Sequence, residues 1–348
     1  MKNQTVFSPK RLAALSVICL TSLMSFAQAS FWSENTSRRS DSPAIEVSQF
    51  KAYNLDVQSL EQWLSRAPQG AATDARHSSL TLTLPMPDGT MEVFTVVNSP
   101  IMAPALARKF PEIQVFAGQG VTHPEFTVRF DLTPHGFHAM ILAEGETVYI
   151  DPYRPNDRET AIVYTRSDFY SSTSKQMSEC MALEVPGSKP STVTKDVDGG
   201  NQVKMMGGSI MQQNRVDNGA NLRTYRLALA CTGEYAQFHG GTVSSVLAAM
   251  NTSMARVNGL FERDVCLTME LVPNNDQLIF LNGSNDPYTN SNGGSMLSQN
   301  INTCNSVIGS SNYDIGHVYS TGGGGVAYLQ SPCGSSKAGG VTGQGAPV

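Results

Sequence analysis

The stretch that decides the fold of the second half of the chain runs from His317 to Val348: HVYSTGGGGVAYLQSPCGSSKAGGVTGQGAPV. The pattern predicts a strand over Ile315–Ser320, a sharp turn at the four glycines Gly322–Gly325, and a second short strand over Val326–Leu329. Consecutive glycines let the backbone turn sharply and let another backbone approach closely. A short strand between such a turn and Pro332 is expected at a sheet edge, where free N–H and C=O groups can pair with an extended peptide. A glycine-rich loop beside an ordinary edge strand is the plainer interpretation of the same residues.

The residues before this stretch alternate between strand and helix patterns. Thr224–Cys231 and Val265–Val272 are runs of strand length, and Thr242 is a suitable N-cap for a helix between them. Ser295–Ile308 is expected to be a second helix. This alternation predicts a parallel sheet with right-handed crossovers, in which the strand after the four glycines returns antiparallel at the edge. Gly339–Gly343 is a candidate for a fifth strand. The apolar positions of the two helices are Val243, Val246, Leu247, Met250, Met254, Val257, Phe261, Leu297, Ile301, Cys304 and Ile308.

Four segments of the second half carry a family resemblance: LRTYRLALACTGEYAQFHGG, NNDQLIFLN, YDIGHVYSTGGGGVAYL, and KAGGVTG after Cys333. With them, residues 222–348 resemble the upper subdomain of a reprolysin-like (adamalysin-type) metzincin zinc peptidase. The resemblance implies an α/β domain with a mixed sheet and an antiparallel edge strand. It also implies a zinc-dependent endopeptidase, a hydrolase whose protein or peptide substrates bind in extended form along that edge. The edge-strand residues are Gly324, Gly325, Val326, Ala327, Tyr328 and Leu329.

The zinc motif of that family is missing from the chain. H-E-x-x-H-x-x-G-x-x-H supplies three imidazole ligands and a glutamate that acts as general base on the zinc-bound water. His239 and His317 lack partners at ligand spacing. The domain is therefore expected to be truncated before the zinc-binding helix, with the ligands beyond residue 348, and this chain alone is expected to be inactive. The alternative function is a non-catalytic secreted module that binds peptides along the edge strand.

Residues 30–194 have a different pattern, which predicts an α+β domain that is mostly antiparallel β-structure. Asp56 can cap a leading helix, and Asp88-Gly89 lies between two alternating runs, as in a β-hairpin. Further strands are expected over Phe126–Leu132, Phe137–Ile141 and Glu146–Ile150. This domain is similar, more weakly, to the inhibitory propeptides of the same peptidases, which implies that it packs on its own catalytic domain. Residues 195–221 are polar and glycine-rich and are expected to form a linker, either a processing site or a plain connection.

Two histidines in the first half invite a metal interpretation. His135 and His138 have helical ligand spacing, but Pro134 and Gly136 place them at a turn between strands. In an extended chain, positions three apart point to opposite faces. We therefore interpret them as surface or turn histidines.

Composition and the N-terminus limit the location and the partners. The net charge is −5 and no basic cluster is present, which argues against nucleic-acid binding. Residues 1–29 have the basic start, short apolar run and A-x-A ending of a signal peptide cut after Ala29. No later segment is apolar enough over a sufficient length to span a membrane. The mature protein is thus expected to be secreted or periplasmic.

Five cysteines remain after signal removal. Cys304, near the end of the second helix, and Cys333, after the edge strand, are both expected at the amino-end side of the sheet, which predicts a disulfide between them. Cys231 and Cys266 belong to opposite ends of parallel strands and are expected to be too far apart to pair. Cys180 is a candidate cysteine switch, in which the thiolate occupies a zinc coordination position. An incidental or intermolecularly paired cysteine is the alternative for Cys180.

Overall fold

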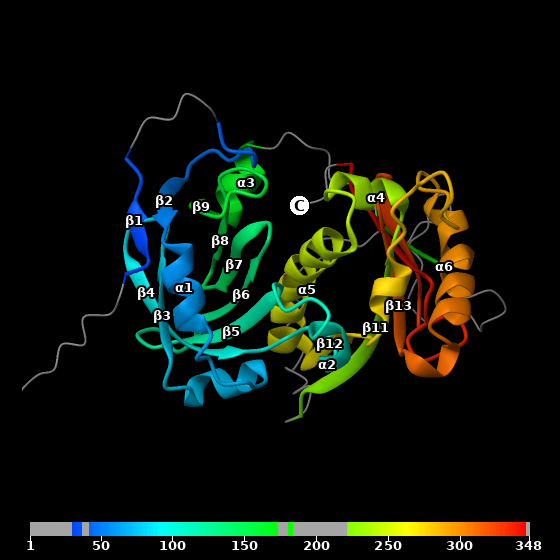
Figure 1. Cartoon of the computed structure of the whole chain (residues 1–348), viewed down its shortest axis with the longest axis horizontal. Coiled ribbons are helices and arrows are strands. Elements are labelled where there is room, and N and C mark those ends of the chain that lie inside the picture. Colours follow the sequence, from blue (N-terminus) through cyan, green and yellow to red (C-terminus); the bar gives the residue numbers. More distant parts are fainter. Residues whose placement is uncertain (1–29, 37–41, 173–179, 184–220, 346–348) are drawn as a thin grey trace, which may run out of the picture.

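The computed structural model describes residues 30–36, 42–172, 180–183 and 221–345. It contains two β-sheets with helix α5 (Val243–Val265) between them (Figure 1). We refer to residues 30–172 as the first half and to residues 221–345 as the second half. The expected signal peptide, including its cleavage position at Ala29, lies outside the described residues. So does the expected linker, apart from its last residue.

The first half is built on a nine-stranded antiparallel sheet, with the order β1-β2-β9-β8-β7-β6-β5-β4-β3. Asp56 caps α1 by accepting a hydrogen bond from the Ser59 N–H, and Leu60 and Leu64 of this helix pack into the core of the sheet. The Asp88-Gly89 hairpin between β3 and β4 is confirmed, and Gly89 adopts φ +95°. The elements are β1 (Trp32–Glu34), β2 (Lys51–Leu55), α1 (Val57–Leu64), η1 (Ala72–His77), β3 (Thr81–Pro85), β4 (Met91–Asn98), α2 (Pro104–Ala107), β5 (Gln114–Gly120), β6 (Thr127–Thr133), β7 (Gly136–Leu142), β8 (Thr147–Pro152), β9 (Thr160–Thr165) and α3 (Arg166–Ser172).

The second half contributes five strands to a mixed sheet, with the order β10-β14-β15-β13-β11-β12, and β10 (Cys180–Leu183) is the sixth. β11, β12, β13 and β15 run parallel, and β14 is antiparallel to β15. Helix α5 covers one face of the sheet and α6 the other (Figure 1). The elements are β11 (Arg223–Cys231), α4 (Gly233–Phe238), α5, β12 (Leu267–Leu271), η2 (Asn275–Leu278), α6 (Gly293–Val307), η3 (Ser310–Asn312), β13 (Ile315–Ser320), β14 (Gly324–Tyr328) and β15 (Gly340–Gly343).

Several predicted boundaries in the second half shift by one or more residues. β14 covers Gly324–Tyr328 instead of Val326–Leu329, and α6 covers Gly293–Val307 instead of Ser295–Ile308. The strand predicted over Val265–Val272 begins only at Leu267, because α5 continues through Val265 and ends at Cys266 in the left-handed conformation, φ +52°. The edge-strand prediction is also corrected. β14 is the outer strand of the second half, but β10 from the preceding part of the chain pairs with its outer side.

The two halves also share backbone pairing at the opposite side of the sheet. The loop after β4 forms an isolated parallel bridge between Met102 and Leu271 of β12. Leu271 N–H donates to Ile101 O at 2.7 Å, and Ala103 N–H donates to Leu271 O at 2.9 Å. Both outer strands of the five contributed by the second half therefore pair with segments that precede it in the chain.

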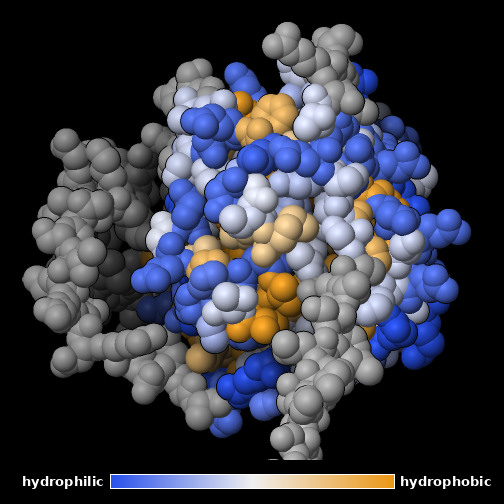
Figure 2. Space-filling view, turned by 90° about the vertical axis from the view of Figure 1, so that its left-hand side faces the viewer, coloured by the Kyte–Doolittle hydropathy of each residue, from blue (hydrophilic) through white to orange (hydrophobic). Residues whose placement is uncertain are grey.

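The surface on the side of the first half is mostly hydrophilic, with scattered apolar side chains (Figure 2). Within the described ranges, no helix combines the length and the apolar character that crossing a membrane requires.

Candidate functional site at the edge of the second sheet

The turn before β14 depends on glycine. Gly324 has φ +93°, a conformation that favours residues without a Cβ. A Cβ on Gly343 would lie 1.8 Å from Gly322 O, so the turn and β15 approach more closely than any side chain would allow. Asn290 holds the turn from outside, because its side chain accepts a hydrogen bond from Thr321 N–H at 3.0 Å and donates one to Thr321 Oγ1 at 2.8 Å. Gly322 and Gly323 thus form the turn, in which Gly322 is closely packed, and Gly324 begins β14.

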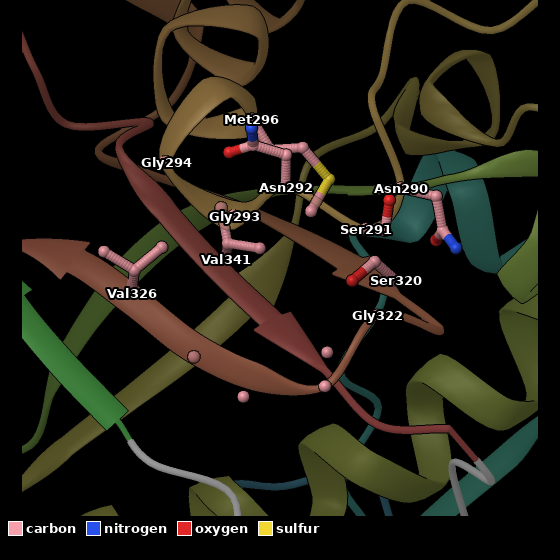
Figure 3. A pocket seen from close by; sticks show the side chains of 14 residues that line it. Asn290, Ser291, Asn292, Gly293, Gly294, Met296, Ser320, Gly322, Val326 and Val341 are labelled. Atoms are coloured by element: carbon pink, nitrogen blue, oxygen red, sulfur yellow. The ribbon is translucent and has the colours of Figure 1, made fainter.

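The two faces of β14 have different environments. Val326 is paired with Val341 of β15, and both side chains are buried beneath α6. Ala327, the next residue, is exposed on the opposite face. Figure 3 shows Val326 and Val341 directed toward the first turn of α6, where they line a cavity of about 240 Å³ together with Met296 and Ser320. The strand is therefore anchored from the α6 side only.

The outer side of β14 is paired with β10. The two strands run parallel, with Cys180 opposite Gly325 and Leu183 opposite Tyr328. Leu329 N–H donates to Leu183 O at 2.7 Å, whereas Tyr328 N–H donates inward to Gly339 O at 2.9 Å. Because donors alternate along a strand, the N–H groups of residues 325, 327 and 329 face β10. An extended segment thus occupies the position that the sequence predicts for a bound peptide.

The register aligns Cys180 with residues of three further strands. Cys180, Gly325 and Thr342 form one row across β10, β14 and β15, and Tyr319 of β13 continues it. Directly paired residues lie on the same face. At Tyr319 this face is the one covered by α5.

His317 lies on this same face. Its Nε2 and Thr342 Oγ1 share a hydrogen bond of 2.8 Å. A Cβ on Gly340 would lie 2.5 Å from His317 Nδ1, so the ring rests over that glycine. Desolvation lowers the pKa of His317 to about 4, which keeps the imidazole neutral at pH 7. A neutral imidazole on β13 and a hydroxyl on β15 are therefore fixed on this face of the sheet, three strands and two strands away from β10.

The predicted Cys304–Cys333 disulfide is absent from the structure, which has both residues as free thiols. Cys304 is buried on α6, 3.6 Å from Asn300 Oδ1. Cys333 lies in an exposed turn with φ +62°, where its N–H donates to Asp314 O. Both residues are near the start of β13, as expected, but one thiol is in the core and the other is at the surface. Cys231 and Cys266 are also free thiols.

Other histidines belong to other contacts, and two of them, His135 and His239, lie near each other with ring centroids 6.3 Å apart. His135 follows β6 in the turn, His138 lies within β7 next to Asp131, and His239 follows α4. Among the residues that the structure describes, no group of three or more His, Cys, Asp or Glu side chains is arranged to hold a metal ion. The described residues therefore do not provide the donor set of a catalytic zinc, and we derive no zinc-dependent step from them.

The sequence does not predict that β10 belongs to the site, apart from Cys180. Its residues Met181–Leu183 form an apolar run of only three after a polar stretch, which is too short to indicate a strand. The only local signal is the change from SSTSKQMSE to CMAL. The pairing partner is about 145 residues away in the chain, so no local pattern could identify it.

The comparisons with known proteins agree with this geometry in the second half. Residues 221–347 match the family model of the M12B reprolysin-like metallopeptidases. The match covers the mixed sheet apart from β10, together with α4, α5 and α6, and it does not include the first half. No curated protein matches the chain in sequence.

Proposed function

We propose that residues 222–348 are the peptide-binding part of a secreted zinc-dependent endopeptidase, and that residues 30–194 are its inhibitory propeptide. The family match of residues 221–347 supports the peptidase class. The observation that carries the proposal is the pairing of β10 with β14, because it shows that the outer side of β14 accepts an extended segment. Zinc would be the cofactor of such an enzyme, with ligands that the described residues do not supply.

In this proposal substrate binds through its backbone. Residues 325 and 327 direct their N–H and C=O groups outward, which is the mode of recognition known as β-augmentation. Ala327 and the two glycines Gly324 and Gly325 leave little side-chain bulk along this edge. Backbone hydrogen bonds would give the affinity. The short side chains of this edge would leave room for substrate side chains on both faces of the sheet.

Latency follows from the same geometry. A peptide substrate and β10 compete for one edge, so the edge must lose β10 before it can bind substrate. Cys180 is the residue of β10 that pairs with Gly325. We keep it as the proposed cysteine switch, and Cys180→Ser in a chain that includes the zinc motif tests that role. A precursor that stays as latent as before would contradict it.

The edge proposal can be tested with the chain as it stands. Leu183 O accepts from Leu329 N–H, so by alternation residue 181 also turns its N–H toward β14. Met181→Pro removes that donor, whereas Ala182→Pro, the matched control, removes an N–H that points away from β14. Hydrogen exchange should become faster at Ala327 and Leu329 in Met181→Pro and much less so in Ala182→Pro.

A synthetic peptide of residues 178–184 then probes the vacated edge. It should bind the Met181→Pro protein and restore slow exchange at Ala327, while the unchanged protein binds it far more weakly. Binding of equal strength to both proteins, or no effect of Met181→Pro on β14, would refute the edge as the peptide site.

The second candidate function is a peptide-binding module without catalysis. It is favoured by the lack of a metal-binding group among the described residues, while the edge for peptides is present. The coding sequence after Val348 separates the two functions, since a zinc motif there supports the enzyme and a stop codon supports the module. For this chain alone we expect no retained zinc after dialysis and no casein digestion. One equivalent of zinc with chelator-sensitive cleavage would contradict this.

A further inference from the structure

Helix α5 carries a polar stripe that faces the first half. Its members recur at helical spacing and are Ser245, Thr252, Arg256, Gly259 and Glu262. Each of them contacts the first half, whereas the apolar stripe of the same helix packs on the second sheet. The stripe therefore serves a contact between the two halves rather than the core of one domain.

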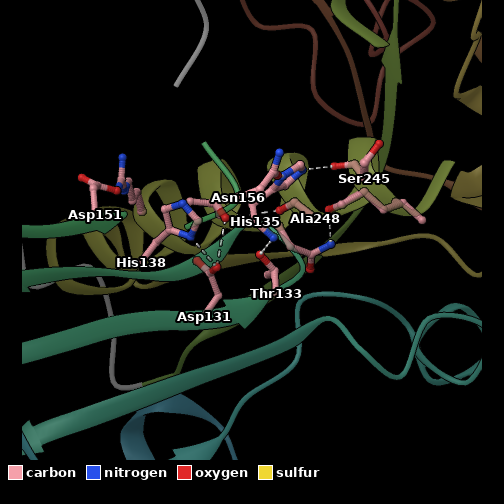
Figure 4. Close-up of polar contacts among 12 residues, drawn as sticks. Asp131, Thr133, His135, His138, Asp151, Asn156, Ser245 and Ala248 are labelled. Carbon is pink, nitrogen blue, oxygen red and sulfur yellow. Dashed lines mark hydrogen bonds and ion pairs between the residues drawn. The ribbon is translucent and has the colours of Figure 1, made fainter. Parts of the chain in front are cut away.

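Hydrogen bonds join the start and the middle of this stripe to β6 and the turn after it (Figure 4). His135 Nε2 donates to the backbone oxygen of Ser245 at 2.7 Å. Thr252 Oγ1 donates to Asp131 Oδ1 at 3.0 Å, and His138 Nδ1 lies 3.1 Å from the same oxygen. Asp131 is buried, so these contacts compensate a carboxylate that water cannot reach.

Two ion pairs, each with one buried and one partly buried member, continue the contact toward the end of the helix. Arg256 binds Asp151, which also accepts a hydrogen bond of 2.7 Å from Tyr164. Burial alone would lower the pKa of Arg256, but Asp151 raises it above its ordinary value, so the guanidinium keeps its charge. Arg129 Nε donates to Glu262 Oε2 at 3.1 Å, and Arg129 is only 6% exposed. Separating the halves would leave these charges without partners.

Shape and apolar contacts complete the interface. A Cβ on Gly259 would lie 3.0 Å from Arg129 Cγ and 3.1 Å from Met140 Cε, so the helix and the sheet are in direct contact there. The hydrophobic core beneath α5 also includes side chains from the first half. They are Ile101, Met102, Leu106, Ile113 and Val115. The halves share one core in addition to their polar contacts.

We propose that this α5 surface is a lasting subunit interface: after a cut within residues 195–220, the first half stays bound as a separate, non-covalent subunit. All contacts above lie outside that segment. β10 is connected to α3 of the bound first half by only seven residues, 173–179, so it stays near β14 at high effective concentration. A cut there alone would not vacate the edge. This consequence for latency rests on the proposed function, whereas the association does not.

The association is tested by placing a site for a sequence-specific protease within residues 195–220 of the full chain. After complete cleavage, size-exclusion chromatography with light scattering should show one particle containing both fragments in 0.15 M salt. Two separate particles would overturn the proposal.

Two pairs of variants identify the contacts responsible. Gly259→Leu improves the helix propensity of α5 but places a side chain against Arg129 and Met140, so the cut fragments should separate. Arg263→Leu, at an exposed position of the same helix, is its control and should not separate them.

Arg256→Met leaves Asp151 without its ion-pair partner and should weaken association on the order of thirtyfold or more. Its control is Arg158→Met, which breaks the exposed pair with Glu61. Unchanged association in both Gly259→Leu and Arg256→Met would refute the role of the α5 stripe.

The readouts also separate this proposal from the proposed function. Fragment association measures the α5 interface, and hydrogen exchange at Ala327 and Leu329 measures the β14 edge. Fragments that stay together while the exchange test fails would refute only the edge, and the reverse result would refute only the interface.

Discussion

The side chain of Asn275 completes the hydrogen bonding of Leu229 in the middle of β11. Its Oδ1 accepts from Leu229 N–H at 2.8 Å, and its Nδ2 donates to Leu229 O at 2.9 Å. Both residues are fully buried. The loop after β12 thus supplies one residue that substitutes for a neighbouring strand and fixes the end of the sheet near α4.

We expect Asn275→Ala to lower the free energy of unfolding by about 2–4 kcal/mol, because two buried backbone groups lose their partners. Urea unfolding measures this difference. Gln277→Ala, in the same short helix but exposed, should change stability by less than about 0.5 kcal/mol. Equal effects of the two substitutions would contradict the role of Asn275.

The free thiols should differ sharply in reactivity. Burial raises the pKa of Cys231 and of Cys304 to about 12, so almost no thiolate forms at pH 8. Iodoacetamide should modify exposed Cys333 within minutes in the native protein and should reach Cys231 and Cys304 only after denaturation. Peptide mapping without reduction reports the result. A peptide linking Cys304 to Cys333 would restore the disulfide that the sequence predicts.

Acid should weaken the structure through His239. Burial, together with the nearby His135, lowers the pKa of His239 to about 4 from its ordinary 6.5. Protons therefore bind the unfolded chain more readily between these values, and the stability that His239 contributes is complete above pH 6.5 and is lost as pH falls toward 4. His239→Gln should flatten this part of the pH dependence by up to about 3 kcal/mol. Identical pH profiles for both proteins would exclude His239 as the cause.

The glycine turn before β14 offers a matched pair of substitutions. Gly343→Ala would place a Cβ 1.8 Å from Gly322 O, which requires the turn and β15 to separate. Gly345→Ala adds a Cβ where no atom lies within 4 Å. We expect the first to lower the free energy of unfolding by about 2 kcal/mol or more and to speed exchange at Ala327. The second should leave both unchanged, and a similar loss in both variants would argue against the packed turn.

The sequence predicts those parts of the fold that have a local cause. Asp56 and Thr242 cap helices as expected, and the Asp88-Gly89 turn joins two strands. The strand over Ile315–Ser320 is present as predicted, and a second strand follows the glycines, although it begins at Gly324 instead of Val326. In each case a short-range preference and the final structure coincide.

The rest depends on contacts between distant residues. The polar stripe of α5 was not recognised, because Thr252, Arg256 and Glu262 look like an ordinary solvent-facing side until the first sheet is placed against them. β10 has the same difficulty, since four residues carry no periodic signal. The Cys304–Cys333 prediction gave the correct end of the sheet but not the depth of each thiol, which depends on side-chain packing.

Two pairings also affect how the protein behaves before it binds any substrate. They are the bridge between Met102 and Leu271 and the pairing of β10 with β14. A sheet whose outer strands are bare can recruit strands of other molecules and form aggregates. Here the segment around Met102, which forms a single bridge, protects β12, and the four-residue strand β10 protects β14. Both are too short to template further strands. The first half and β10 together would thus prevent the second sheet from polymerising while the protein is concentrated, and a chain deprived of either segment should become prone to fibril formation.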